Sequence, residues 1–232
     1  MQVLNILHGL KGAGRTLNRL SRKDVTAVKR RVNDVKKLTS TKFLNLYELD
    51  MVSENGKHSP YYVSSRAKST EQLKLKTRKN NADGVIIYSL YGEALDRVVL
   101  IRQYRCPLDD YIYEFPAGLV DEGETFKEAG IRELKEETGL DFTPADAPEM
   151  YCKPFFTTIG MTDESCGTIY GYASGTVSKA GQEENEEIEI VLADKAEVRR
   201  ILKEENVAIM CAYMLMHFLQ AEPGHAFDFL KI

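Results

Sequence analysis

The stretch GLVDEGETFKEAGIRELKEETGL, residues 118–140, decides how the fold of this chain is predicted. Near its end, Glu133, Glu136 and Glu137 follow one another at spacings of three and one. At about 100° per residue, side chains at positions i, i+3 and i+4 of a helix share one face. Like charges at this spacing repel each other by roughly a few tenths of a kcal/mol per pair, so the crowding needs an explanation.

Two explanations are open from the residues alone. A solvated helix could carry surplus glutamate that nearby cations offset, namely Lys127, Arg132 and Lys135. The other explanation is a hard divalent cation, because carboxylate oxygens are the ligands that Mg²⁺ or Mn²⁺ prefers. The helix is predicted over residues 125–138, and Gly139 suits the turn that ends it. We also expect Arg132 to form a supporting ion pair with Glu124.

Several residues of this stretch occur at the spacings of a known sequence motif. Gly118 is followed after five residues by Glu124, and after seven more by RELKEETGL, residues 132–140. At every fixed position this resembles the Nudix box, the signature of a family of hydrolases. The resemblance implies a loop–helix–loop that holds divalent metal. It also implies hydrolysis of a nucleoside diphosphate that is linked to another group.

The resemblance implies roles for individual residues. Glu133, Glu136 and Glu137 would be metal ligands, and the backbone carbonyl of Ala117 would be a further one. Gly118 would permit a tight backbone turn beside them. The bound cations would neutralise phosphate charge and lower the pKa of a bound water, and a nearby carboxylate would take the second proton.

The residues ahead of the box narrow the resemblance to one branch of the family. RVVLIRQYRCPLDDYIYEFPAG, residues 97–118, is similar to the lead-in of the ADP-ribose pyrophosphatases. By this resemblance Arg105 and Arg102 would bind substrate, Arg105 through a phosphate, and Glu114 would lie near the mouth of the site. The alternative is that both arginines are surface strand residues paired with the two aspartates that follow them.

Two further segments are similar to this branch. TTIGMTDES, residues 157–165, resembles a substrate-binding loop in which Gly160 and Glu164 fit, whereas Ile159 replaces the expected proline. That departure leaves other ADP-sugars and UDP-sugars open as substrates. The hairpin LYELDMVSENGKHSPYYVSSR, residues 46–66, resembles the small sheet that the branch uses to form dimers and to bind adenine. Its candidate stacking residues are Tyr47, Tyr61 and Tyr62.

The branch places its general base on a loop ahead of a late strand. The corresponding segment here is GQEENEEIEI, residues 181–190. We favour Glu186 or Glu187, because they stand directly ahead of the strand. Glu183, Glu184 and Glu164 stay open as alternatives, and a charged, solvated loop accounts for the glutamates that are not the base.

Charge divides the chain into a basic arm and an acidic body. Residues 1–42 hold eleven Lys or Arg and two Asp, a net charge of +9, so the total of −4 leaves −13 on residues 43–232. The valines of SRKDVTAVKRRVNDVKKL recur at spacings of three and four, which predicts a helix over residues 21–38. A basic arm could contact nucleic acid, but no aromatic residue is interleaved in it. We therefore expect a solvated helix, or packing on a partner chain, and no nucleic acid partner.

Strand-like and helix-like segments follow the arm. Strands are predicted at 43–51, 61–68, 84–90, 97–105, 111–118, 150–156, 168–177 and 186–193, and helices at 125–138, 195–205 and 206–220. This order predicts an α+β fold, a Nudix-type α/β/α sandwich with a mixed central sheet. A small N-terminal β-hairpin and the basic helical arm precede it. The expected divisions are an arm over 1–42, a hairpin region over 43–82 and a hydrolase domain over 83–232.

Composition adds an expectation about location. No apolar run approaches the roughly 18 residues that cross a bilayer. The first residues place an apolar patch before the basic ones, which is the reverse of a signal peptide. The four cysteines show no CxxC pairing and are expected to be reduced thiols. These features predict a cytoplasmic protein that does not contact membranes.

Together these patterns predict a pyrophosphatase that depends on Mg²⁺ or Mn²⁺. Its substrate would be ADP-ribose or a related nucleoside diphosphate sugar, and its products a nucleoside monophosphate and a sugar phosphate. We expect a homodimer formed through the N-terminal hairpin region. Two alternatives stay open. One is a sensor of nucleotide sugars whose arm binds nucleic acid, and the other is a hydrolase that removes altered nucleoside triphosphates.

Overall fold

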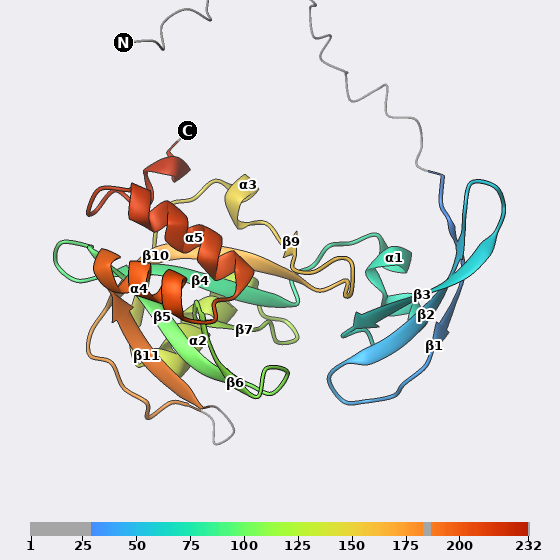
Figure 1. The fold of residues 1–232 in the computed structure, drawn as a ribbon, viewed down its shortest axis with the longest axis horizontal. Coiled ribbons are helices and arrows are strands. Elements are labelled where there is room, and N and C mark those ends of the chain that lie inside the picture. Colours follow the sequence, from blue (N-terminus) through green and yellow to red (C-terminus); the bar gives the residue numbers. More distant parts are fainter. Residues whose placement is uncertain (1–28, 183–186, 232) are drawn as a thin grey trace, which may run out of the picture.

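The computed structural model describes residues 29–182 and 187–231. Within them, the strands form two separate sheets (Figure 1). The smaller sheet contains β1 (Val32–Lys37), β2 (Asn45–Val52) and β3 (His58–Ser65). The larger sheet contains β4 (Gly84–Tyr91), β5 (Arg97–Arg105), β6 (Asp110–Glu114), β7 (Ala117–Leu119), β8 (Asp141–Pro144), β9 (Phe155–Phe156), β10 (Ser165–Ser174) and β11 (Ile188–Ala193). The helices are α1 (Lys74–Thr77), α2 (Phe126–Thr138), α3 (Glu149–Cys152), α4 (Lys195–Glu204) and α5 (Ile209–Gln220), with short 3-10 turns η2 (Thr70–Gln72) and η3 (Asp228–Leu230).

Helices cover the eight-stranded sheet on both faces (Figure 1). Its main order is β11-β5-β4-β10-β8, and β10 runs parallel to β4 while the other pairings are antiparallel. On β4, Val85 and Ile87 pack with Leu134 of α2, whereas Tyr88 packs with Leu215 of α5. Successive side chains of a strand point to opposite faces, so this one strand contributes to two cores. The predicted α/β/α sandwich with a mixed sheet is confirmed.

Local sequence signals set both ends of α2. Oγ1 of Thr125 accepts a hydrogen bond from the N–H of Glu128, and the Glu128 carboxylate accepts one from the N–H of Thr125 at 2.9 Å. This capping box satisfies two backbone donors at the helix start. Gly139 follows the helix in the left-handed conformation, with φ of 73°. The predicted helix over 125–138 and its terminating glycine are confirmed, with Thr125 as the cap.

Most of the predicted strands are present. β2, β4 and β5 match the segments expected at 43–51, 84–90 and 97–105 to within two residues. The segment expected at 111–118 is divided into β6 and β7. The segment expected at 150–156 is wrong in its first half, where α3 forms a single helical turn. Pro148 and Pro154 flank that turn, and only the two residues of β9 pair with β10.

The N-terminal helix prediction is wrong for residues 32–37, which form β1 and pair with β2. Val32 lies opposite Met51, and Val35 lies opposite Leu49, with a shift of register between them. Such a bulge adds one residue to a strand, so two valines three positions apart reach the same face. The spacing that indicated a helix therefore also fits a bulged strand. Residues 29–31 and 38 of the predicted helix are not helical either, and residues 21–28 lie outside the described part of the chain.

The small sheet contacts the loop at Gly160 and Met161 through β3, on the edge that does not pair with β2. The N–H of Ser64 donates to the carbonyl of Met161 at 2.9 Å, and the hydroxyl of Tyr61 donates to the carbonyl of Gly160 at 2.6 Å. Tyr47 is fully buried in the small sheet and donates to the carbonyl of Ala67 at 2.7 Å, so its expected role as a stacking residue is wrong. In the described part of the chain, no helix has both the length and the apolar character that spanning a membrane requires.

Candidate active site

Hydrogen bonds join strand β7 to side chains of helix α2. The N–H of Ala117 donates to Oε2 of Glu137 at 3.2 Å. The carbonyl of Leu119 accepts from Nη2 of Arg132 at 3.2 Å. Glu137 is only 2% exposed, so its carboxylate is fixed by burial as well as by the strand. The sequence places the acidic residues on one helix face, and β7 gives that face a backbone surface to lie against.

Gly118 makes room for Glu133. A Cβ built on Gly118 would lie 1.9 Å from the carboxyl carbon of Glu133, a distance that no real contact allows. Gly118 itself lies in β7 and is not one of the glycines with positive φ. The expected tight turn at this position is therefore wrong. The position requires glycine because the Glu133 side chain occupies the space that any side chain at position 118 would need.

Arg132 is the counter-charge of the acidic face. It holds Glu124 through two hydrogen bonds, Nε to Oε1 at 3.1 Å and Nη2 to Oε2 at 3.0 Å, which confirms the predicted ion pair. Its Nη1 donates to Glu133 at 2.9 Å and to Glu136 at 3.0 Å. Hydrogen bonding from Arg132 lowers the pKa of the Glu124 carboxyl below its ordinary value, and the same bond raises the pKa of Arg132. One guanidinium thus contacts three glutamates and holds them close together.

The donor chemistry of this face fits a hard divalent cation, since three carboxylates project from one side of a helix. Within residues 29–182 and 187–231, however, no group of three or more His, Cys, Asp or Glu side chains converges to hold a metal ion. Glu133 and Glu136 are directed to Arg132, and Glu137 to the N–H of Ala117. The ligand roles expected for the glutamates and for the carbonyl of Ala117 stay predictions.

The two arginines ahead of the box have glutamate partners. Arg105 donates to Glu114 from Nε at 3.1 Å and from Nη2 at 2.5 Å. Arg102 donates to Glu189 at 3.2 Å and lies over the ring of Tyr111, 4.0 Å from its centroid. Neither pairing involves the aspartates that the surface interpretation named, Asp109 and Asp110. Arg105 ends β5, and Glu114 ends β6 three residues before Ala117, so the pair joins β5 to the strand that leads into the acidic face.

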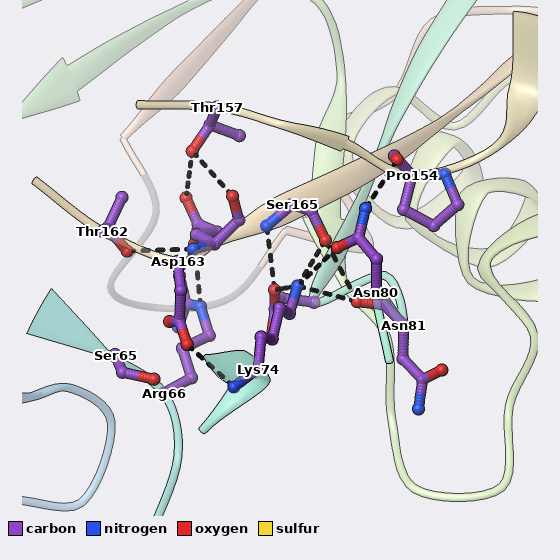
Figure 2. Close-up of polar contacts among 12 residues, drawn as sticks. Ser65, Arg66, Lys74, Asn80, Asn81, Pro154, Thr157, Thr162, Asp163 and Ser165 are labelled. Carbon is purple, nitrogen blue, oxygen red and sulfur yellow. Dashed lines mark hydrogen bonds and ion pairs between the residues drawn. The ribbon is translucent and has the colours of Figure 1, made fainter. Parts of the chain in front are cut away.

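Glu164 is held by the N-terminal part of the chain. Its carboxylate accepts from Nε of Arg66 at 2.8 Å and from Oγ1 of Thr157 at 3.3 Å. Figure 2 labels Arg66 and Thr157 among the polar contacts in this part of the chain. No periodic pattern or motif marks Arg66 in the sequence, so sequence analysis did not find it. The substrate role expected for Glu164 stays a prediction.

The candidates for the general base fall into two groups. Glu183, Glu184 and Glu186 lie outside the described residues. Glu187 lies beside Tyr111, whose hydroxyl donates to its carboxylate, and this bond raises the pKa of Tyr111. Sequence analysis also missed Gln182, which donates to the backbone carbonyl of Glu137 at 2.7 Å. Both contacts join residues far apart in the chain, so no local signal could have found them.

Comparison with known proteins places the fold and the box in one family. The NUDIX domain profile matches residues 80–211. The ADP-sugar pyrophosphatase of Mus musculus is 33% identical over 117 residues, 49% of this chain and 54% of that protein. The ADP-ribose pyrophosphatase of Saccharomyces cerevisiae is 30% identical over 131 residues, 55% of this chain and 53% of that protein. The chain thus spans about half the length of these curated relatives.

A shorter and closer match is the putative nudix hydrolase 2 of Caenorhabditis elegans, 44% identical over 86 residues, 37% of each chain. Among solved structures, a crystal structure of an ADP compounds hydrolase superposes with a TM-score of 0.55 at 18% identity. It covers 77% of this chain and 86% of its own, and at that identity it supports the fold alone. Since the profile spans more than half of the sequence and includes both β7 and α2, this chain belongs to the NUDIX domain family.

Proposed function

We propose that this chain hydrolyses the diphosphate bond of ADP-ribose or a related nucleoside diphosphate sugar in the presence of Mg²⁺ or Mn²⁺. The products would be a nucleoside monophosphate and a sugar phosphate. The observation that carries the proposal is the acidic face of α2, where Glu133 and Glu137 lie against β7 and Glu136 contacts Arg132 beside them. The substrate class is supported by the relatives whose names specify ADP-sugar and ADP-ribose pyrophosphatases.

The acidic face would hold the metal through Glu133, Glu136 and Glu137. When bound, the metal would neutralise phosphate charge and lower the pKa of a water molecule. The N–H of Ala117 fixes the carboxylate of Glu137, and Glu124 fixes the guanidinium of Arg132. Because Arg132 offsets the repulsion between neighbouring carboxylates, these groups stay close together and ordered before substrate binds.

Substrate binding and proton transfer would use side chains around this face. Arg105, with Arg102, would bind the phosphates, and Glu114 orients the guanidinium of Arg105. Water would attack phosphorus, the bridging oxygen would leave with the second phosphate, and Glu186 or Glu187 would accept the proton that the water loses. Glu164 would contact the part of the substrate beyond the diphosphate.

We also propose a homodimer that forms through the small N-terminal sheet. Leu46 is 36% exposed and Tyr62 is 51% exposed. Both lie on the face of the sheet opposite to Tyr47 and Val63, which are buried. Exposed apolar side chains on a sheet face suit contact with a second copy of this chain.

The decisive experiment is a screen of nucleoside diphosphate sugars and nucleoside triphosphates with Mg²⁺, in which released phosphomonoester is measured. We expect cleavage of an ADP-sugar by the full chain. Glu137→Gln should lower kcat/KM by more than about 100-fold, because even the loss of an outer partner of a metal ligand costs about 10–100-fold. Lys127→Gln, at an exposed position of the same helix, is the matched control and should keep full activity.

Three outcomes would contradict the proposal. Cleavage of triphosphates alone would favour removal of altered nucleotides. Tight binding of a nucleotide sugar without turnover would favour a sensor. Equal activity of Glu137→Gln and Lys127→Gln would remove the acidic face from the reaction.

A further inference from the structure

Lys74 lies at the centre of a polar junction between the N-terminal segment and the start of β10 (Figure 2). Its Nζ donates to Oδ2 of Asp83 at 2.6 Å, to the carbonyl of Asn81 at 2.9 Å, and to Oγ of Ser165. The side chain of Lys74 is 15% exposed and that of Asp83 is 22% exposed. The ammonium is therefore largely removed from water, and acceptors from four separate residues surround it, the fourth being Oδ1 of Asn80 at 3.3 Å.

A largely buried ion pair is a poor source of net stability. Removing two charges from water costs nearly as much as their attraction returns. Loss of one partner strongly destabilises the protein, because the remaining charge is then buried without compensation. The Lys74–Asp83 pair is thus better suited to fixing a position than to strengthening the fold. Its effect depends on which parts of the chain Asp83 holds.

Asp83 connects two segments that lie far apart in the sequence. Its Oδ2 also accepts from the N–H of Ser165 at 2.9 Å, and its own N–H donates to the carbonyl of Ser165 at 2.8 Å. Its carbonyl accepts from the N–H of Val120 at 3.1 Å. Ser165 begins β10, and Val120 directly follows β7. The aspartate therefore holds the start of one strand and the chain that leaves another.

The chain that leaves β7 leads directly to the acidic face. A Cβ on Gly84 would lie 2.9 Å from the carbonyl oxygen of Gly118, so β7 sits against β4 with no space to shift inward. After Val120, four residues lead to Glu124, which is bound to Arg132. This loop is thus fixed at Val120 by Asp83 and at Glu124 by Arg132. A displacement of Asp83 would move the first of these two attachments.

We infer that Lys74 is a positioning residue for the acidic face. By compensating the charge of Asp83, it holds the loop from Val120 to Glu124 in register with α2. Arg132 and the carboxylates that it contacts then keep their places. The inference rests on the proposed function, because it takes the acidic face to be the site of a divalent cation. By this inference, the N-terminal segment helps to position the acidic face. Lys74 does so indirectly, because it contacts neither the acidic face nor Arg132.

The test compares Lys74→Met with Lys76→Met in the full chain. Lys76 lies on the same short helix and is exposed, so it is the matched control. Mn²⁺ binding is measured by calorimetry without substrate, and kcat and KM are measured separately. We expect Lys74→Met to weaken Mn²⁺ binding and to lower kcat by at most about tenfold, the lower limit for loss of an outer partner of a metal ligand, because Lys74 acts through Asp83 and not on a ligand directly. Lys74→Arg should restore part of both, and Lys76→Met should change neither.

A double variant separates position from stability. Lys74→Met with Asp83→Asn removes both charges, so its unfolding midpoint should lie closer to wild type than that of Lys74→Met alone. Its Mn²⁺ affinity should stay reduced, because the contact is still absent. Wild-type Mn²⁺ affinity in a folded Lys74→Met chain, or in the double variant, would overturn the inference. A wild-type chain that neither binds Mn²⁺ nor cleaves diphosphates would overturn the proposed function and this inference together.

Discussion

The eight-stranded sheet and the three-stranded sheet bury their strands in different ways. In β4, seven of the eight residues are buried, because helices cover both faces of the sheet. In β2, only Asn45, Tyr47 and Leu49 are buried, and they alternate with more exposed neighbours. The larger sheet therefore has little space for a larger side chain, whereas one face of the smaller sheet is exposed to solvent. A substitution in the first should disturb the site or the core far more than the same substitution in the second.

The largest expected difference is between two glycines. Gly118→Ala would place a methyl group on the Glu133 side chain, so we expect kcat/KM to fall by more than about 100-fold, as for loss of a metal-ligand contact. Gly56 lies in the hairpin turn of the small sheet with φ of 80° and nothing within 4 Å of an added Cβ. Gly56→Ala should cost about 1–2 kcal/mol of stability for its left-handed conformation and leave turnover intact. Kinetic assays and urea unfolding of both variants measure this. Full activity of Gly118→Ala would show that the reaction does not depend on the Glu133 side chain lying in the space beside residue 118.

A smaller difference is expected between two core leucines. Leu134 is fully buried between α2 and the large sheet, and Leu49 is 8% exposed in the small sheet. Truncation to alanine costs about 2–5 kcal/mol in protein cores, and the cost is greatest where neighbours cannot close the cavity. We expect Leu134→Ala near the upper end and Leu49→Ala near the lower end. Urea unfolding followed by circular dichroism measures both. An equal or larger loss for Leu49→Ala would contradict the contrast between the two sheets.

A small effect on turnover is expected from shortening the N-terminus. A chain that begins at residue 29 keeps β1, whereas one that begins at residue 39 leaves β2 and β3 as a two-stranded hairpin, which is marginally stable by itself. Both should hydrolyse substrate within several-fold of the full chain. The reason is that β1 pairs with β2 in the small sheet and not with the elements that carry the acidic face of α2. Hydrogen exchange should rise in β2 only for the shorter chain. Sedimentation of all three tests the dimer, and a monomeric full chain would contradict that proposal.

The parts of the fold that sequence analysis predicted correctly depend on neighbours along the chain. Thr125 and Glu128 form a capping box within one turn, and Gly139 supplies the conformation that ends the helix. The Glu124–Arg132 pair spans only eight residues, because Glu124 directly precedes the cap of α2 and Arg132 lies on that helix. Most of β4 and residues 98–101 of β5 are apolar because they are buried on both faces of the sheet. In each case the signal is complete within a short window.

The parts that sequence analysis missed depend on partners distant in the chain. Arg66 and Glu164 are 98 residues apart, and Lys74 and Ser165 are 91 residues apart. The steric need for Gly118 became visible only once β7 and the Glu133 side chain were placed together. No periodicity records such contacts. β1 was missed for another reason, because a bulge gave its valines the spacing of a helix.

The two edges of the small sheet have different consequences for aggregation. The backbone of β3 is bonded at Ser64 to the loop at Met161, so that end of its outer edge is already paired. β1 is the outer strand on the other side in the described part of the chain, and three of its six residues are charged, Asp34, Lys36 and Lys37. Charged side chains along an outer strand oppose the addition of further strands. Should the hairpin region associate with a copy of itself, the open face rather than the outer strand is the surface that permits a closed pair instead of a growing fibril.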